Sequence, residues 1–341
     1  MKRIIFSILV FLLGLGEFIF AAKVATFPTL NNPFYIIVDA EQLYITDGPT
    51  INIFSLKDYK PVVKFGRAGE GPQEFTLLPR RSEGNVNIFV HRDYILANSQ
   101  GKVSYFSKSG KFLSERRYDT NGLFFQPLGK QFVGEGFDQV DNITFNIRNI
   151  YDPEFKKGLE LYRRKSFPQP DGKDRNPFHM ISPIMRVYQD KVYINDAEEL
   201  KILVFDSNGK KLPDISVNYD KLPVKEGDRQ NIINWYKTNI NFKDLYESWK
   251  NLLKFPKYFP AIRWFHVADD KVYVLTHKKE AEKSEFYIFD IKGTFLKKIM
   301  LPLKEKDERL WYPYTIGNGK LYQLVEDEDS ETWELHVTDI K

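Results

Sequence analysis

The chain has no cysteine among its 341 residues, and this absence limits its chemistry. Disulfide bridges, thiolate metal sites and acylation of a lipoprotein cysteine are all excluded. Histidine is scarce as well, and the few histidines lack the spacing of metal ligands. Each is expected to be a surface residue or a satisfied strand residue. They are His91, His179, His266, His277 and His336.

Neither sign of charge is in large excess. The 50 Lys and Arg residues are interspersed with 46 Asp and Glu residues, so there is no basic stripe. Such a stripe is typical of nucleic-acid binding, and the sequence therefore predicts no nucleic-acid partner. The chain also lacks a G-x-S-x-G elbow, an H-E-x-x-H pair, a Walker loop and an acidic EF-hand loop. No catalytic residue and no cofactor are predicted from these motifs.

The amino terminus has the pattern of a secretory signal peptide. Lys2 and Arg3 are followed by an apolar run over residues 4–15 and by the small residues Ala21 and Ala22. We expect cleavage near Ala22, a secreted or periplasmic location and no membrane span in the mature chain. The alternative is a membrane anchor, which needs about 20 apolar residues, and Glu17 interrupts this run.

Aromatic residues are abundant, with 28 Phe, 19 Tyr and 5 Trp. Aromatic side chains favour strands over helices. A recurring order of apolar strand, tight polar turn, second strand, loop and third strand appears six times. The second strands are expected at 42–45, 93–96, 130–133, 191–194, 271–274 and 320–323. The third strands are expected at 51–56, 103–107, 145–151, 202–206, 285–290 and 333–338.

A fourth strand follows in five of the six units. These strands are expected at 62–65, 112–118, 159–163, 212–217 and 295–301. The sixth unit ends with its third strand, and an open edge invites aggregation. We predict that residues 23–27 supply its outer strand. The sequence therefore predicts an all-β fold over residues 23–341, a six-bladed β-propeller of four-stranded blades closed by its first strand. A large β-sandwich or two smaller β domains are the alternatives.

Residues 66–75 have the sequence GRAGEGPQEF. This segment resembles the G-x-x-G-x-G-P-x-E-F signature of secreted bacterial six-bladed propellers related to NHL-repeat domains. The common form has Gly where this chain has Gln73. The resemblance implies a propeller over nearly the whole mature chain. Most such proteins have no assigned activity, so the resemblance supports architecture more than function.

The long connections all belong to one class of loop. Loops from strand two to strand three, and from strand four to the next blade, must share one face of the disc, which we call the elaborated face. The long insertions at 66–75, 165–183 and 217–260 all lie there, whereas turns on the other, plain face are short. Long loops in compact domains are usually functional or disordered. We therefore expect the elaborated face to bind a ligand.

The largest insertion has helical periodicity over about residues 226–256, between blades 4 and 5. Ile232, Tyr236 and Ile240 form one apolar stripe, and a second stripe follows, with Asn241 as its expected cap. One interpretation is a helical pair that packs on the disc and hides its own apolar stripe. The other is a lid or docking arm beside the channel mouth.

The favoured function is an exported binding or scaffolding propeller that presents the elaborated face to a protein, peptide or glycan. We expect Arg67 and Glu74 to form a charge-assisted bond that holds their own loop. The candidate ligand-binding residues on this face are Arg67, Glu70, Glu74, Arg175, His179, Trp235, Trp249 and Arg263.

An enzyme is the alternative function. Six-bladed propellers that resemble lactonases and lyases hold a metal in the channel with carboxylates and Asn, and calcium is expected here only under this alternative. The candidate ligands are Asp47, Asn98, Asp138, Asp196 and Glu326. Their positions also suit ordinary turns, in which polar residues are common. The sequence therefore favours binding over catalysis.

Overall fold

Six antiparallel sheets of four strands each form the body of the protein. The computed structural model describes residues 20–76, 84–166, 176–178, 183–195, 199–240 and 242–341. Blade 1 contains β2 (Pro33–Asp39), β3 (Gln42–Asp47), β4 (Thr50–Ser55) and β5 (Pro61–Phe65). Blade 2 contains β8 (Asn87–Val90), β9 (Ile95–Ser99), β10 (Lys102–Phe106) and β11 (Phe112–Arg117). Blade 3 contains β12 (Leu123–Leu128), β13 (Gln131–Val140), β14 (Ile143–Tyr151) and β15 (Lys157–Lys165).

The remaining blades follow the same order. Blade 4 contains β16 (Met185–Tyr188), β17 (Lys191–Asn195), β18 (Lys201–Phe205) and β19 (Lys211–Ser216). Blade 5 contains β20 (Trp264–Ala268), β21 (Lys271–Glu280), β22 (Lys283–Asp290) and β23 (Phe295–Pro302). Blade 6 contains β24 (Tyr314–Gly317), β25 (Lys320–Asp327), β26 (Thr332–Asp339) and β1 (Ala22–Phe27). The predicted six-bladed propeller is confirmed.

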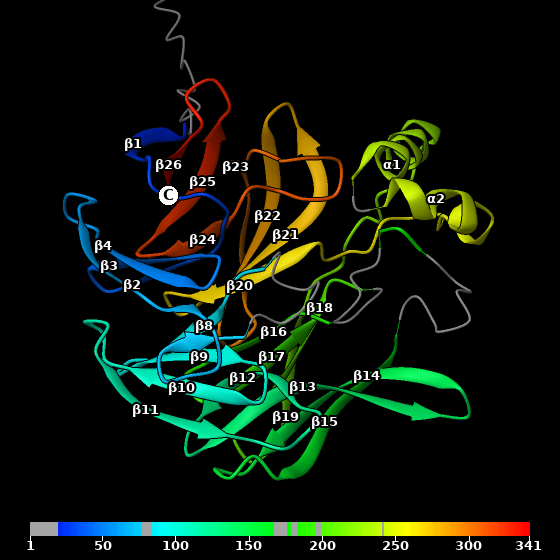
Figure 1. The fold of residues 1–341 in the computed structure, drawn as a ribbon. Helices are drawn as coiled ribbons and strands as arrows, with labels where there is room; N and C mark the ends of the chain where they lie inside the picture. Colours follow the sequence, from blue (N-terminus) through cyan, green and yellow to red (C-terminus); the bar gives the residue numbers. More distant parts are fainter. Residues whose placement is uncertain (1–19, 77–83, 167–175, 179–182, 196–198, 241) are drawn as a thin grey trace, which may run out of the picture.

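The first strands of the blades form the centre of the ring. β24 contacts both β2 and β20, and β16 contacts both β20 and β12. Figure 1 shows the sheets arranged around this centre, with outer strands such as β11 and β1 at the rim. The start of each first strand is reached by a connection on the elaborated face. Residues at these strand starts therefore lie at the elaborated-face end of the central channel.

Each inner strand packs against both neighbouring blades. Leu43 and Ile45 of β3 belong to a core that includes Tyr322 and Leu324 of blade 6, whereas Tyr44 faces a core shared with blade 2. Successive side chains of a strand point to opposite faces, so both sets must be apolar. This two-sided burial explains the nearly continuous apolar runs of the second strands.

The amino-terminal strand closes the ring as predicted. β1 pairs antiparallel with β26, with Ala22 opposite Val337 and Phe27 opposite Trp333. Phe27 is buried, and its ring centroid lies 4.4 Å from that of Phe54 in blade 1. The outer edge of β26 is therefore covered by the other end of the chain.

Short turns on the plain face tie neighbouring blades together. Several of them place both central residues at positive φ, as at Gln189 and Asp190 (47° and 54°), which the twist of a two-residue hairpin favours. Polar groups of these turns then bond across the blade boundaries. The bonds are Gly129 N to Asp190 Oδ1 at 2.8 Å, Tyr188 Oη to Asp270 Oδ1 at 3.1 Å, Gly319 N to Asp269 Oδ2 at 2.7 Å and Asn318 Nδ2 to Ala40 O at 3.0 Å.

The insertion between β19 and β20 is helical, as predicted. It contains α1 (Glu226–Thr238), α2 (Lys243–Trp249) and a 3-10 turn (Lys250–Leu252), which Figure 1 shows projecting beside blade 5. Ile232 and Tyr236 are buried, but Ile240 is 78% exposed because α1 ends at Thr238. The expected cap Asn241 lies outside the described residues. Within the described ranges, neither helix is long and apolar enough to cross a membrane.

Candidate functional site

The loop after blade 1 is a closed clasp. β6 (Arg67–Ala68) pairs parallel with β7 (Glu74–Phe75), and Arg67 Nε donates to Glu74 Oε1 at 2.8 Å. The backbone N–H of Gly71 donates to Glu74 Oε2, also at 2.8 Å. These bonds, that of Gly71 first and that of Arg67 next, lower the pKa of Glu74 below its ordinary value. The expected bond between Arg67 and Glu74 is confirmed.

A buried lysine fastens this clasp to blade 2. Lys102 Nζ donates to the carbonyl oxygens of Glu70 and Gly71, at 3.1 and 2.7 Å, and to Glu115 Oε2 at 3.0 Å. Phe75 closes the loop from below in the apolar core between blades 1 and 2. The carboxylate of Glu74 and the carbonyl of Glu70 therefore hold the loop, and the described contacts give them no other role.

Gln73, which stands where the signature has Gly, lowers the stability of the clasp. Gln73 has φ 61°, a left-handed conformation that favours glycine and costs other residues about 1–2 kcal/mol. We expect Gln73→Gly to raise the free energy of unfolding by roughly 1 kcal/mol, because the extra freedom of the unfolded glycine offsets part of the relief. Urea titration followed by circular dichroism measures this, and a lower stability would contradict the account.

An arginine of the β23–β24 loop contacts the helical insertion. Arg309, in the β23–β24 loop, lies with its guanidinium carbon 5.1 Å from the centroid of the Trp235 ring. Its Nη1 donates to the hydroxyl of Tyr236 at 2.9 Å. Trp235 and Tyr236 are both buried on α1, and Trp249 packs in the same cluster beside Phe242. Of the predicted candidates, Trp235 therefore contacts the blades through Arg309, whereas Trp249 packs within the insertion.

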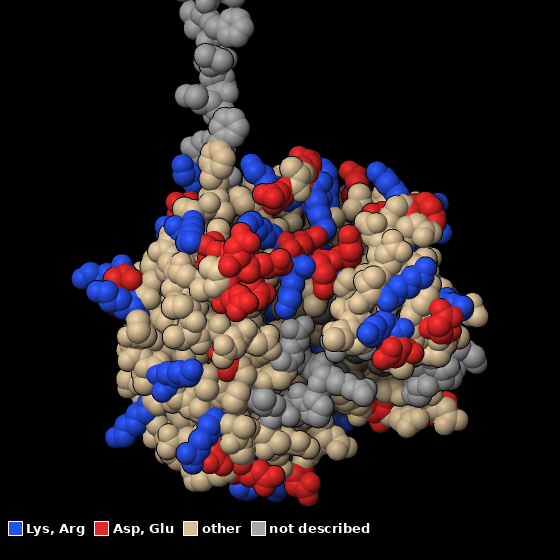
Figure 2. Space-filling view, turned by 45° about the horizontal axis from the view of Figure 1, so that its top comes forward, with Lys and Arg blue, Asp and Glu red and all other residues tan. Residues whose placement is uncertain are grey.

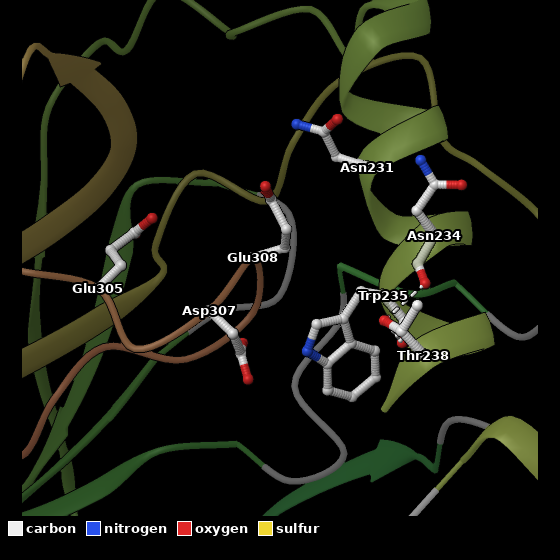
Figure 3. A pocket seen from close by; sticks show the side chains of 7 residues that line it. All are labelled: Asn231, Asn234, Trp235, Thr238, Glu305, Asp307 and Glu308. Carbon is white, nitrogen blue, oxygen red and sulfur yellow. Dashed lines mark hydrogen bonds between the residues drawn. The ribbon is translucent and has the colours of Figure 1, made fainter. Parts of the chain in front are cut away.

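A groove of about 500 Å³ lies between α1 and the β23–β24 loop. Its walls are polar, and every charged residue among them is acidic. Figure 3 shows the side chains facing this space from the helix on one side and from the loop on the other. The lining residues are Asn231, Asn234, Trp235, Thr238, Glu305, Asp307 and Glu308.

Arg263 connects this groove to the ring. Its guanidinium pairs with Glu305, which also pairs with Lys279, and lies 4.7 Å from the centroid of the Trp311 ring. Burial, aided by the cations of Arg263 and Lys279, lowers the pKa of His277 well below its ordinary value. Arg263 is thus buried below the groove and is not itself among its lining residues.

Of the other predicted residues, some make structural hydrogen bonds and some lie outside the described residues. Arg175, His179 and Asp196 lie outside the described residues. Asp47 accepts hydrogen bonds from the backbone N–H groups of Asn31 and Asn32, which fixes the approach to blade 1.

The remaining metal-ligand candidates are dispersed over several blades. Asn98 bonds the backbone of Phe125 in blade 3, and Asp138 pairs with Arg163 at 2.7 Å. Glu326 lies opposite Trp333 at the end of β25. Among the residues that the structure describes, no three His, Asp or Glu side chains come together as possible metal ligands.

Sequence reasoning missed the residues at the channel end. Arg186 of β16, Trp264 of β20 and Tyr314 of β24 all come from the starts of first strands. A lone charge within the apolar run Ile184–Tyr188 was the available signal, since an arginine on an inner strand needs a partner. Nothing in the sequence shows which strands surround it.

No protein-family model and no curated protein matches this chain. Solved structures are similar at low identity. A luciferin-regenerating enzyme is 9% identical with a TM-score of 0.44, covering 94% of this chain and 95% of that one. Hsv2 of Kluyveromyces lactis is 11% identical with a TM-score of 0.40, covering 91% and 100%. BamB of Moraxella catarrhalis is 11% identical with a TM-score of 0.29, covering 88% and 71%. The assignment of a six-bladed propeller rests on the sheet order and register described above.

Proposed function

We propose that this chain is a binding propeller whose elaborated face holds a basic segment of a peptide or protein. The observation that carries the proposal is the groove between α1 and the β23–β24 loop. It combines three carboxylates with the side-chain amides of Asn231 and Asn234. Carboxylates and amide oxygens accept hydrogen bonds from Lys and Arg side chains.

The three carboxylates of the groove differ in whether they already have partners within the protein. Glu305 is engaged by Arg263 and Lys279, and Asp307 accepts the backbone N–H groups of Arg309 and Leu310. Glu308 is exposed and makes no described ion pair. Figure 2 shows Asp and Glu side chains gathered near the middle of the visible face, beside the hollow that separates the helical insertion from the blades. Glu308 is therefore the carboxylate that we assign to ligand contact.

The walls of the groove are preorganised. The contacts of Arg309 with Trp235 and Tyr236 join the helix to the loop that supplies the acidic wall. A groove whose two walls are already fixed loses little conformational entropy when it binds. This supports a binding role for the insertion beyond that of a plain connector.

The proposal predicts saturable binding of a fluorescein-labelled Lys-rich peptide, weakening as salt is raised. Glu308→Lys is expected to weaken binding about fivefold, because one rim charge contributes about 1 kcal/mol. Fluorescence anisotropy measures both effects. Lys306→Glu is the matched control, since Lys306 lies in the same loop but does not line the groove. Equal affinity for a Glu-rich peptide would contradict the assignment, and salt-independent binding of a neutral oligosaccharide would favour a glycan instead.

We infer that the chain is exported through its amino-terminal leader, which the charge and hydropathy pattern of residues 1–22 supports. We also infer kinship with the NHL-like secreted propellers. The clasp supports this inference, because Gly69, Gly71 and Glu74, which match the signature, all take part in one set of contacts.

A further inference from the structure

An arginine without a counter-ion lies at the centre of the ring. Arg186 is on β16, the first strand of blade 4, and its Nη1 donates to the carbonyl of its neighbour Met185 at 2.8 Å. In the described part of the chain, no carboxylate pairs with it. Arg186 is half-buried, whereas Arg148 and Arg263 are buried and do have such partners: Arg148 lies 3.4 Å from Glu135, and Arg263 pairs with Glu305.

The guanidinium of Arg186 faces strands of other blades. Its central carbon lies 4.8 Å from the centroid of the Trp264 ring on β20. Tyr314 of β24 and Tyr35 of β2 lie within its electrostatic reach, so it faces the channel that the first strands enclose. Burial in this position lowers the pKa of Arg186 to about 10, which leaves it charged at neutral pH.

The unused donors of Arg186 are accessible. Its Nε and Nη2 bond to no group in the described ranges, yet they are not among the side-chain nitrogens sealed from solvent. A planar guanidinium presents its N–H groups as a fork that matches the two oxygens of a carboxylate. The fork is therefore open toward the channel, with the Trp264 ring beside it.

Neighbouring polar groups are also unsatisfied. Tyr314 is only 6% exposed, and its hydroxyl has no hydrogen-bond partner among the described residues. The same holds for Nε2 of His266, whose ring centroid lies 4.8 Å from that of Tyr314. Buried polar groups are normally bonded, so these two sealed groups beside Arg186 would gain partners only if a ligand bound to Arg186 displaced the side chains around them.

We propose that the channel end at the elaborated face binds the carboxylate of a small aromatic acid, with Arg186 as its ion-pair partner. Among the described residues, Arg186 is the cation at this site without an ion-pair partner, and Glu135 is already within its electrostatic reach, so a single negative charge balances it better than a phosphate dianion. The rings of Trp264, at the start of β20, and Trp311, in the β23–β24 loop, lie 5.6 Å apart and suit a flat apolar body.

Benzoate is the probe that tests this assignment on the full chain. Titration with benzoate is expected to change the tryptophan fluorescence until the signal saturates. The dissociation constant should be about 1 mM or below, as a ligand of this size allows. Arg186→Gln is expected to weaken binding at least tenfold, and Arg186→Lys severalfold. Benzyl alcohol, the neutral analogue, and inorganic phosphate are each expected to bind at least tenfold more weakly than benzoate. Arg92→Gln, at an exposed arginine paired with Asp93, is the control and should leave benzoate binding unchanged.

Thermal stability without ligand separates a binding role from a structural one. A half-buried charge without an ion-pair partner does not stabilise the fold, so Arg186→Met should melt at the same temperature as the unsubstituted chain or higher. A melting temperature lower by several degrees would overturn the proposal, as would unchanged benzoate binding by Arg186→Gln. Saturation by phosphate in preference to benzoate would overturn the carboxylate assignment. Binding of the Lys-rich peptide should be the same in the Arg186 variants, so failure here is distinct from failure of the proposed groove function.

Discussion

Removal of β1 (residues 22–27) is expected to lower the melting temperature by about 10 °C. Truncation of one buried Phe such as Phe27 alone costs about 3–5 kcal/mol, and a domain of this size loses roughly 2 °C per kcal/mol. The deletion also leaves the backbone of β26 unpaired along its outer edge, which favours aggregation. Differential scanning calorimetry at several protein concentrations would measure both the shift and the loss of solubility.

Two further measurements make this prediction specific. Lys23→Ala removes only the surface ion pair between Lys23 and Glu334, and should change stability by less than about 1 kcal/mol. A synthetic peptide of residues 20–31, added to the shortened chain, should restore much of the lost stability by pairing with β26. An unchanged melting temperature after deletion would show that β1 does not close the ring.

Gly66→Ala is expected to destabilise the clasp by several kcal/mol. Gly66 has φ 87°, and a Cβ atom there would lie 2.5 Å from a ring carbon of Phe75 and 2.7 Å from the carbonyl oxygen of Pro49. Backbone strain at positive φ contributes about 1–2 kcal/mol, and displacement of the buried Phe75 adds a packing term of similar or larger size. Equilibrium unfolding in urea gives the magnitude.

Gly48→Ala is the matched control for that variant. Gly48 is also in blade 1 with φ 58°, but a Cβ atom there would meet nothing within 4 Å. Gly48→Ala should lower the free energy of unfolding only by the backbone strain, about 1 kcal/mol. Equal losses at the two positions would mean that the contacts with Phe75 and Pro49 do not constrain the clasp.

Local patterns in the sequence were sufficient for the fold. Strands such as β3 and β25 are buried on both faces, so their apolar runs stand out between turn residues. The missing outer strand of blade 6 could be inferred because an open edge is unfavourable, and β1 was the unassigned strand. Arg67 and Glu74 could be paired because they are seven residues apart in one loop.

The candidate sites could not be predicted because they depend on long-range placement. The groove joins Asn234 on α1 to Glu308 in the β23–β24 loop, and the channel end joins Arg186 to Tyr314. Such pairs meet only because the ring brings nonadjacent loops and strands together. The side-chain stripe of α1 was predicted from its period, whereas the exposure of Ile240 depends on where the backbone leaves the helix.

The pairing of β1 with β26 also determines when folding can finish. Lys23 and Glu334 are 311 residues apart in the chain, so the first strand is made long before its partner. At synthesis rates of about 5–20 residues per second, this interval is roughly 15–60 s. During that time the outer edge of blade 6 cannot form, and a chaperone that binds exposed β-strand edges would protect the chain from aggregation. The nascent chain therefore cannot complete blade 6 until β26 has emerged.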